Sequence, residues 1–175
     1  GQTVARELLI AYLNTGTYAS PVWKPIGKRV EDSSADYDWG EESSQDILGN
    51  TNNSMKKPVI SQTFDPCKLE AGDEAQLKIW NLAIVDQDAQ ALSAQDMLIV
   101  HYYAGFAERY PACMVKPSSI GGEGGGSVGM PLDVTYGGAR VIGTASKEED
   151  GTISFTPYDV AGLMVDYKNR LFKRI

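Results

Sequence analysis

Long apolar segments are missing from this chain of 175 residues. No apolar run approaches the roughly 18 residues that a membrane-spanning helix requires. No secretory signal peptide is recognisable either. We therefore expect no membrane partner, and we expect the chain to fold in a reducing cytoplasm.

Cysteine and histidine are also scarce: the chain has two cysteines, Cys67 and Cys113, and one histidine, His101. Two cysteines in a chain of this size do not make a disulfide scaffold, so we expect two reduced, partly buried thiols. His101 lies in a run of apolar strand residues, which favours a histidine satisfied in the core or at an interface over a general base. The sequence has no G-x-S-x-G elbow and no Walker loop. We therefore expect no enzymatic activity.

Positive charge is in deficit, since 16 Lys and Arg residues stand against 23 Asp and Glu residues, for a formal net charge of −7. A free-standing nucleic-acid-binding protein usually has a basic patch, and here basic residues gather only near the C-terminus. Specific binding to phosphate is therefore disfavoured. An acidic surface would suit a protein past which DNA slides without sticking.

Two short patterns resemble ligand sites but lack the context that such sites need. Residues 124–129 (GGGSVG) match G-x-G-x-x-G, yet Met130-Pro131 and a strand follow instead of a helix, so we expect a connecting loop. Asp36 and Asp38 can share one face of a strand, but no calcium-loop pattern supplies the further oxygen ligands that a cation needs. We expect neither a cofactor nor a metal.

Strand patterns dominate what the sequence does contain. The expected strands cover residues 7–13, 36–44, 59–64, 96–104, 112–115, 132–136, 139–146 and 153–155. The continuous apolar run at 96–104 is typical of a strand buried on both faces. The proline-rich segment 20–28 is expected to be irregular or to lie at a sheet edge, Gly137-Gly138 to break a strand, and Asp150-Gly151 to form a hairpin turn. The pattern predicts a mainly β fold, a β-sandwich or barrel of about eight strands, with a helix packed against it.

One helix is predicted over residues 73–85, with acidic residues at its start, where the helix dipole favours them. Its first apolar patch consists of Ala75, Ile79, Leu82 and Ala83, the second of Leu77, Trp80 and Ile84, and its wet side of Glu74, Lys78 and Asn81. The two patches together cover roughly 220° of the helix, against an apolar stripe of roughly 100° or more on a surface helix. We expect a neighbouring subunit to cover the second patch.

The segment from residue 36 to residue 64 combines an acidic strand with a long polar loop. Tyr37 and Trp39 fall on one face of the expected strand, and Asp36, Asp38 and Glu42 fall on the other. The loop, about 40–57, carries the turn formers Asn50, Asn52 and Asn53 and the isolated apolar residues Ile47, Leu48 and Met55. It predicts an extended hairpin whose tip projects from the body and whose apolar residues would make contacts.

Four segments resemble, in order, the major tail tube proteins of siphophages of Gram-positive hosts. They are WKPIGKRVEDSSADYDWGEESSQDILGN (23–50), MKKPVISQTFDPC (55–67), AGDEAQLKIWNLA (71–83) and GGEGGGSVGMPLDVTYGG (121–138). The resemblance covers about residues 5–157, and we expect these to form one tail-tube-like domain. Residues 158–175 depart from the family pattern and are expected to form a C-terminal tail or arm.

The resemblance implies a β-sandwich or barrel with one flanking helix, similar to the tube proteins of type VI secretion. It implies hexameric rings that stack into a hollow tube, which conducts the genome into the host. The protein would belong to the virion tail, would assemble in the host bacterial cytoplasm, and would meet tape-measure, terminator and baseplate proteins. The loop at 40–57 would reach the adjacent ring. From the residues themselves, the acidic row of Asp36, Asp38 and Glu42 is a candidate for the face that lines the lumen, because DNA would slide past it by repulsion, but the opposite face of the strand can equally line the lumen.

Two other hypotheses remain open. The chain can be a monomeric carbohydrate- or protein-binding β-sandwich, such as a phage adhesin or a lectin-like module, if Tyr102, Tyr103 and Tyr110 form a concave aromatic patch. It can also be another virion part, such as a tail terminator or a head decoration protein, which the dimensions of its rings would distinguish.

Overall fold

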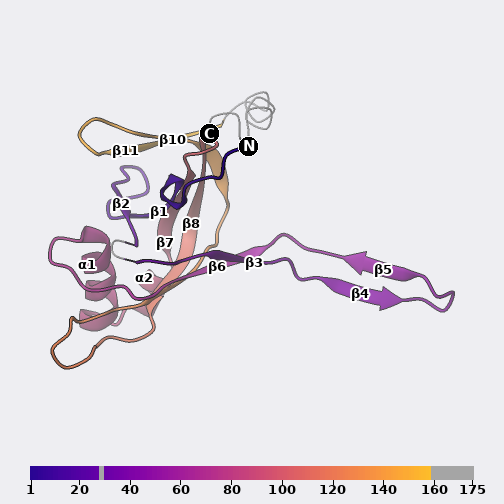
Figure 1. The fold of residues 1–175 in the computed structure, drawn as a ribbon, viewed down its shortest axis with the longest axis horizontal. Coiled ribbons are helices and arrows are strands. Elements are labelled where there is room, and N and C mark those ends of the chain that lie inside the picture. The colour runs from indigo at the N-terminus through magenta and orange to yellow at the C-terminus, as the bar shows by residue number, and fades with distance from the viewer. Residues whose placement is uncertain (28–29, 159–175) are drawn as a thin grey trace.

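The structure is a computed structural model that describes residues 1–27 and 30–158 (Figure 1). Its strands are β1 (Leu9–Asn14), β2 (Trp23–Pro25), β3 (Ala35–Asp38), β4 (Glu42–Gln45), β5 (Thr51–Ser54), β6 (Val59–Phe64), β7 (Gln95–His101), β8 (Phe106–Pro117), β9 (Leu132–Thr135), β10 (Val141–Lys147) and β11 (Ile153–Pro157). Its helical segments are a 3-10 turn (Arg6–Leu8), α1 (Glu74–Trp80), a π-helical turn (Asn81–Val85) and α2 (Ala89–Leu92). The predicted mainly β fold with one main helix is confirmed. From residue 159 on, the predicted C-terminal arm lies outside the described residues.

Nine of the described strands form one antiparallel sheet in the order β2-β1-β7-β8-β9-β6-β3, and β10 pairs with both β8 and β11. β8 belongs to two parts of this sheet, because its residues 107–109 pair with β10 and its residues 114–117 pair with β9. β2 lies within the proline-rich segment 20–28 and is an edge strand, as expected. β4 and β5 pair only with each other and form an arm that projects far from the body (Figure 1).

A glycine pair bends the chain between β9 and β10. The N–H of Ala112 in β8 donates to the carbonyl of Gly137 (3.1 Å). A Cβ at Gly137 would lie 2.7 Å from the carbonyl oxygen of Ala112, and Gly138 has a φ of +90°. A side chain at either position would therefore collide with β8 or strain the backbone. The predicted break at Gly137-Gly138 is confirmed.

Two apolar cores lie on opposite faces of β7. Met97 and Ile99 belong to the main core, whereas Leu98 and Val100 belong to the second. The main core also takes residues from β1, β6, β8, β9 and α1, and the second takes residues from β1, β2, β8 and β11. The prediction that the apolar run of β7 is buried on both faces is confirmed.

Both cysteines are free, and both are more deeply buried than we expected. Cys67 is 1% exposed and Cys113 is 0% exposed. Burial raises the pKa of the Cys113 thiol to about 12. Neither thiol is therefore a ready nucleophile, which agrees with the expected structural role.

The helix α1 begins at the predicted place, and two of the three residues of the predicted wet side, Glu74 and Asn81, are exposed as predicted. Asp73 caps it by accepting the N–H of Gln76 (3.2 Å). Lys78 was expected in solvent, but it is half-buried and donates to the carbonyl of Asn14 (2.6 Å). Burial lowers the pKa of Lys78. The prediction for Lys78 was wrong because its long side chain reaches back to the end of β1, a contact that helical spacing does not reveal.

Candidate assembly surfaces

The expected loop of residues 40–57 is a paired hairpin in the structure, and its strands β4 and β5 form the arm. Glu42 lies opposite Ser54, and Gln45 lies opposite Thr51. One carboxylate oxygen of Asp46 accepts the N–H groups of both Leu48 and Asn50 (2.9 Å each), which closes the turn. These hydrogen bonds hold the pKa of Asp46 below its usual value, and the bond from the backbone of Asn50 has the largest effect. The predicted projecting hairpin is confirmed.

The arm carries apolar side chains with no cover from their own subunit. The exposed fraction is 101% for Ile47, 82% for Leu48 and 65% for Met55. All residues from 41 to 57 are exposed, including Asn50, Asn52 and Asn53. An isolated two-stranded hairpin is marginally stable at best in water. A contact partner would therefore both cover the apolar tip and hold the arm.

The second apolar patch of α1 is only partly uncovered. Leu77 is 56% exposed, and Ile84, in the π-helical turn, is 38% exposed. Trp80, in contrast, is half-buried and packs against the main core of its own subunit. The surface open to a neighbour is thus Leu77 with Ile84, and Trp80 contributes mainly to folding.

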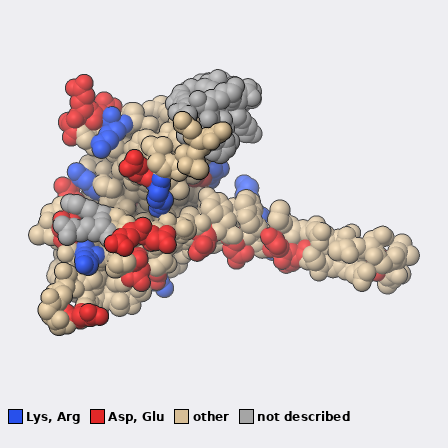
Figure 2. Space-filling model, viewed as in Figure 1, with Lys and Arg blue, Asp and Glu red and all other residues tan. Residues whose placement is uncertain are grey.

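The acidic and aromatic residues of β3 lie on different faces. Asp36 pairs with the exposed Ser61 of β6, whereas Tyr37 pairs with Ile60, which is buried in the main core. Since directly paired residues point to the same face, Asp36 and Asp38 belong to the outer face. Figure 2 shows acidic side chains in a row where the arm leaves the sheet.

The third acid of the predicted row, Glu42, does not lie in the same strand. The expected strand 36–44 breaks at residues 39–41, where Gly40 has a φ of +56°. Glu42 therefore belongs to β4 of the arm. The prediction of one continuous strand was wrong because a glycine in the left-handed region reorients the chain there.

The outer face of β6, β9 and β8 continues the face of Asp36 and is mostly polar, although the exposed Val59 and Met114 also lie on it. Ser61 lies opposite Thr135 of β9, and Thr63 lies opposite Asp133, to whose carboxylate it donates (3.1 Å). Lys116 of β8 lies opposite Asp133 on its other side.

His101 takes part in a buried polar cluster around Glu108. The carboxylate of Glu108, whose side chain is 5% exposed, lies 2.8 Å from His101 Nε2 and accepts the Nε–H of Arg140 (2.8 Å) and the hydroxyl of Tyr110 (3.1 Å). The hydroxyl of Tyr103 lies 2.8 Å from His101 Nδ1. The expectation of a histidine satisfied within the fold is confirmed.

Burial by itself raises the pKa of Glu108, but the hydrogen bonds of His101 and Arg140 and the charge of Arg140 outweigh it and hold the pKa below the usual 4.5. Glu108 therefore stabilises the fold above that pH, and this contribution is lost as the pH falls through the folded-state pKa. We expect Glu108→Gln to cost about 2 kcal/mol at pH 7, less than the ~3–5 kcal/mol of a fully buried pair, because Arg140 is half exposed.

Urea unfolding at neutral pH and at about pH 3.5 measures this effect. The gap in unfolding free energy between parent and variant is expected to shrink at the lower pH, because Glu108 of the unfolded chain is then largely protonated and folding has to release that proton. A gap that stays constant with pH would contradict the assigned role of the Glu108 charge.

The tyrosines considered for a carbohydrate-binding patch do not form one. Tyr110 is 6% exposed and lies in the main core. Tyr102 is half-buried, and its hydroxyl lies 2.7 Å from that of Tyr12. The requirement of an exposed aromatic patch is therefore not met by these residues.

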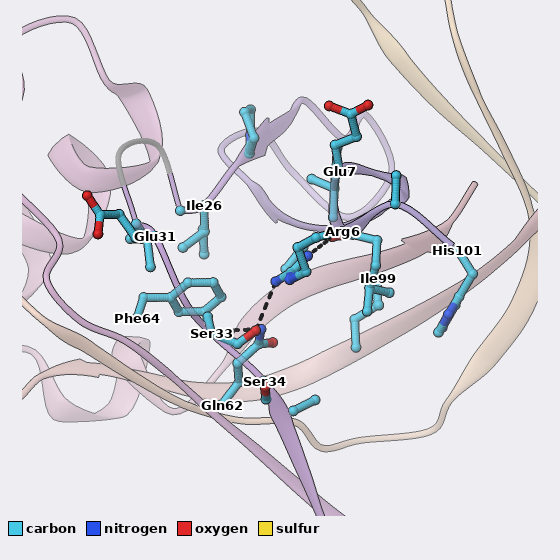
Figure 3. Close-up of a pocket in the computed structure, with 18 of the residues that line it drawn as sticks. Arg6, Glu7, Ile26, Glu31, Ser33, Ser34, Gln62, Phe64, Ile99 and His101 are labelled. Carbon is cyan, nitrogen blue, oxygen red and sulfur yellow. Dashed lines mark hydrogen bonds between the residues drawn. The ribbon is translucent and has the colours of Figure 1, made fainter. Parts of the chain in front are cut away.

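A cavity of about 1210 Å³ opens between the β1–β7 and β3–β6 parts of the sheet (Figure 3). Its apolar lining includes Leu9, Ala11, Ile26, Ala35, Phe64 and Ile99. Arg6 reaches over it from the N-terminal segment and donates to the carbonyl of Ser33 (3.0 Å) and to that of Leu9. No pattern in the sequence indicated this cavity, because strands from distant parts of the chain enclose it.

Within residues 1–27 and 30–158, no group of three or more His, Cys, Asp or Glu side chains is arranged to hold a metal ion. No helix in the same part of the chain is long and apolar enough to cross a membrane.

The sequence matches no family model and no curated protein. Among solved structures, the chain is similar to the tail of an empty GTA particle obtained by helical refinement with C6 symmetry. The TM-score is 0.52 and the identity 15%, over 88% of this chain and 99% of that chain. The two chains share one fold. This agrees with the mainly β fold with one flanking helix that the resemblance to tail tube proteins implied.

Two further structures are similar at lower scores. The sheath/tube terminator of an extracellular contractile injection system (PVC) has a TM-score of 0.45 and 11% identity, over 81% of this chain and 97% of that chain. The tube-terminating cap of an anti-feeding prophage has a TM-score of 0.45 and 14% identity, over 83% of this chain and 93% of that chain.

Proposed function

We propose that this chain is the subunit of a phage tail tube. Copies of it form hexameric rings, the rings stack into a hollow tube, and the tube conducts DNA into the host. The observation that carries the proposal is the arm, whose tip residues Ile47 and Leu48 have no cover in their own subunit. The fold shared with a particle tail of C6 symmetry supports it.

The arm suits contacts between stacked rings. Residues 38 to 47 span roughly 30 Å at about 3.3 Å per residue, which is enough to reach beyond the subunit's own body. A contact between different surfaces of identical subunits is heterologous, so it generates closed rings or open stacks. In this proposal Ile47, Leu48 and Met55, flanked by Asn50, Asn52 and Asn53, make the contact between rings.

The uncovered part of α1 suits contacts between neighbours in a ring. Leu77 and Ile84 form an exposed apolar surface beside the half-buried Trp80. Burying such side chains between subunits would contribute roughly 1.5–3 kcal/mol each. The assembled tail would then take its place in the virion with tape-measure, terminator and baseplate proteins, after assembly in the host bacterial cytoplasm.

Analytical ultracentrifugation over a wide concentration range tests self-association. We expect a monomer in dilute solution and large species that grow with concentration, since each subunit has both halves of a heterologous contact. A strictly monomeric protein at millimolar concentration would contradict the proposal.

The outer face that carries Asp36 and Asp38, with Glu42 at the base of the arm, lines the lumen in this proposal. Carboxylates repel the DNA phosphates, so the genome passes without binding. We expect the triple replacement of these acids by lysine to leave tube assembly intact but to lower genome delivery at least tenfold, because phosphates would be held in the passage.

A matched control changes the same number of charges elsewhere. Replacing Glu123, Glu148 and Glu149 with lysine alters three exposed acids of the body, and genome delivery should remain near the parent level. Equal delivery by both triple variants, counted as host cells that receive DNA per particle, would contradict the assignment of the lumen.

A further inference from the structure

The chain contains both an uncovered apolar tip and an open apolar cavity. The tip is the turn of the arm, where Ile47 is 101% exposed and Leu48 is 82% exposed. The cavity, of about 1210 Å³, opens between β1 and β3 (Figure 3). Within one subunit the two cannot meet, because the arm leads away from the body (Figure 1).

The mouth of the cavity lies at the root of the arm. Ala35 and Tyr37, which line the cavity, belong to β3, the strand that runs out into the arm. The tip lies roughly 30 Å beyond the end of β3, because residues 38 to 47 extend by about 3.3 Å per residue. A second copy displaced along the arm by this length would bring its own mouth to the tip of the first. Its arm would then point onward to a third copy, so the contact repeats without closing.

We propose that the turn of the arm, with Ile47 and Leu48, inserts into the cavity between β1 and β3 of a copy in the next ring. This inference rests on the proposed tube function and names the acceptor site for the arm.

The chemistry of the two surfaces agrees with this pairing. The cavity presents Leu9, Ile26, Phe64 and Ile99, and its volume exceeds what two aliphatic side chains occupy, so the turn backbone can enter as well. Ile26, Phe64 and Ile99 are already buried from most solvent in the subunit. Such a contact therefore removes from water the tip and the part of the cavity lining that solvent still reaches, which is the driving force of association.

Charge adds a weaker preference at the rim. Asp46, the acid of the turn, would approach the rim, where Arg6 supplies a guanidinium. Glu7 and Glu31 lie on the same rim and oppose it. The contact is therefore mainly apolar, and added salt should change it little.

The contact area between one tip and one cavity is small, and this limits the affinity of a single contact. A tip of two or three side chains buries far less than the roughly 1,200 Å² of a standard stable complex. A single tip in a single cavity would thus be weak, and a dilute subunit stays monomeric. In stacked rings several such contacts act together, and their combined strength rises by multivalency.

Site-specific cross-linking tests the contact in the assembled protein. Thr51→Cys, directly after the turn of the arm, is combined with Ser34→Cys at the mouth of the cavity, and assembled protein is treated with a short bismaleimide. Both positions are exposed, and the native thiols of Cys67 and Cys113 are buried. We expect a ladder of covalent dimers, trimers and longer chains, because each copy offers one tip and one mouth.

The control pair combines Thr51→Cys with Ser154→Cys on the exposed side of β11. We expect it to assemble equally well and to give at least tenfold less cross-linked product. Thermal unfolding of the reduced variants checks that each is folded.

The outcomes separate this inference from the proposed function. Tubes that form without a tip-to-mouth ladder, or with equal ladders in both pairs, overturn the inference and leave the tube function standing. In that case the cavity has no arm tip as its occupant. If the parent protein forms no assemblies at all, the proposed function fails first, and the acceptor site fails with it.

Discussion

Replacing Ile47 and Leu48 with serine is expected to abolish tube assembly and to leave the folded subunit as stable as the parent. Both side chains are almost fully exposed in the subunit, so their loss removes no contact of the fold. In the tube each buried side chain contributes roughly 1.5 kcal/mol or more, so the pair is worth about 3 kcal/mol, more than 100-fold in association constant. Light scattering against concentration measures the threshold for assembly, and urea unfolding measures the stability of the subunit.

The matched control removes the same kind of side chain from another loop. Ile120 and Val128 lie in the glycine-rich segment and are 45% and 49% exposed. Their replacement by serine is expected to shift the assembly threshold less than threefold. The account would be contradicted if the tip variant assembled at the parent threshold, or if both variants lost assembly equally.

Replacing Arg109 with alanine is expected to have the largest effect on folding. Its guanidinium donates to both carboxylate oxygens of Asp96 (3.0 and 3.1 Å from Nε) and to the carbonyl of Tyr18 (3.0 Å), and it lies 3.9 Å from the centre of the Tyr18 ring. Arg109 is 8% exposed and Asp96 is 9% exposed. Removing one partner leaves an unpaired buried charge, which costs about 3–5 kcal/mol. That is a large part of the roughly 5–15 kcal/mol that stabilises a typical domain.

A double variant distinguishes loss of charge pairing from loss of packing. Arg109→Met together with Asp96→Leu removes both charges and keeps most of the volume. We expect it to recover at least half of the stability lost in Arg109→Ala, since an apolar pair often replaces a buried ion pair at little cost. The midpoint of thermal or urea unfolding reports both effects. If the double variant is as unstable as the single variant, the charge pair is not the source of the effect.

The sequence predicted most of the fold where apolar residues follow a clear period. The unbroken apolar run of β7 indicated a strand buried on both faces, and Met97 and Leu98 indeed point into different cores. The same approach found only the last part of β8, although this strand runs from Phe106 to Pro117. The first half of β8 was not predicted, because the charged residues Glu108 and Arg109 interrupt the apolar pattern there. Both residues are nevertheless buried, because each has a charged, hydrogen-bonded partner: Arg140 for Glu108 and Asp96 for Arg109.

The candidate contact residues were predicted to different extents. The polar sequence around Ile47 and Leu48 indicated a projecting hairpin, because stranded apolar residues amid turn formers have nothing nearby to pack on. The regular pairing of β4 with β5 was not expected, since ESSQ and TNNS lack the β-branched and aromatic residues that are typical of strands. Trp80 was assigned to the surface between subunits, because helical spacing alone does not reveal which side of the helix packs against the core of the same subunit.

The cavity between β1 and β3 lay beyond any sequence pattern. Its walls come from the N-terminal segment, the region around residue 30, β6 and β7, which approach one another only after the sheet has bent. Local periodicity reports which face of a strand is buried, but it does not report how two parts of a sheet separate at their edges. Such a site is found only from the arrangement in space.

Electron microscopy of the concentrated protein tests the central claim most directly. The claim is that copies of this chain cover one another's exposed arm and helix surfaces in a stacked assembly. The account predicts hollow tubes of uniform width with six subunits in each ring and with every arm tip enclosed by the adjacent ring. Isolated particles of monomer size at millimolar concentration, or assemblies in which Ile47 and Leu48 stay in solvent, would contradict it.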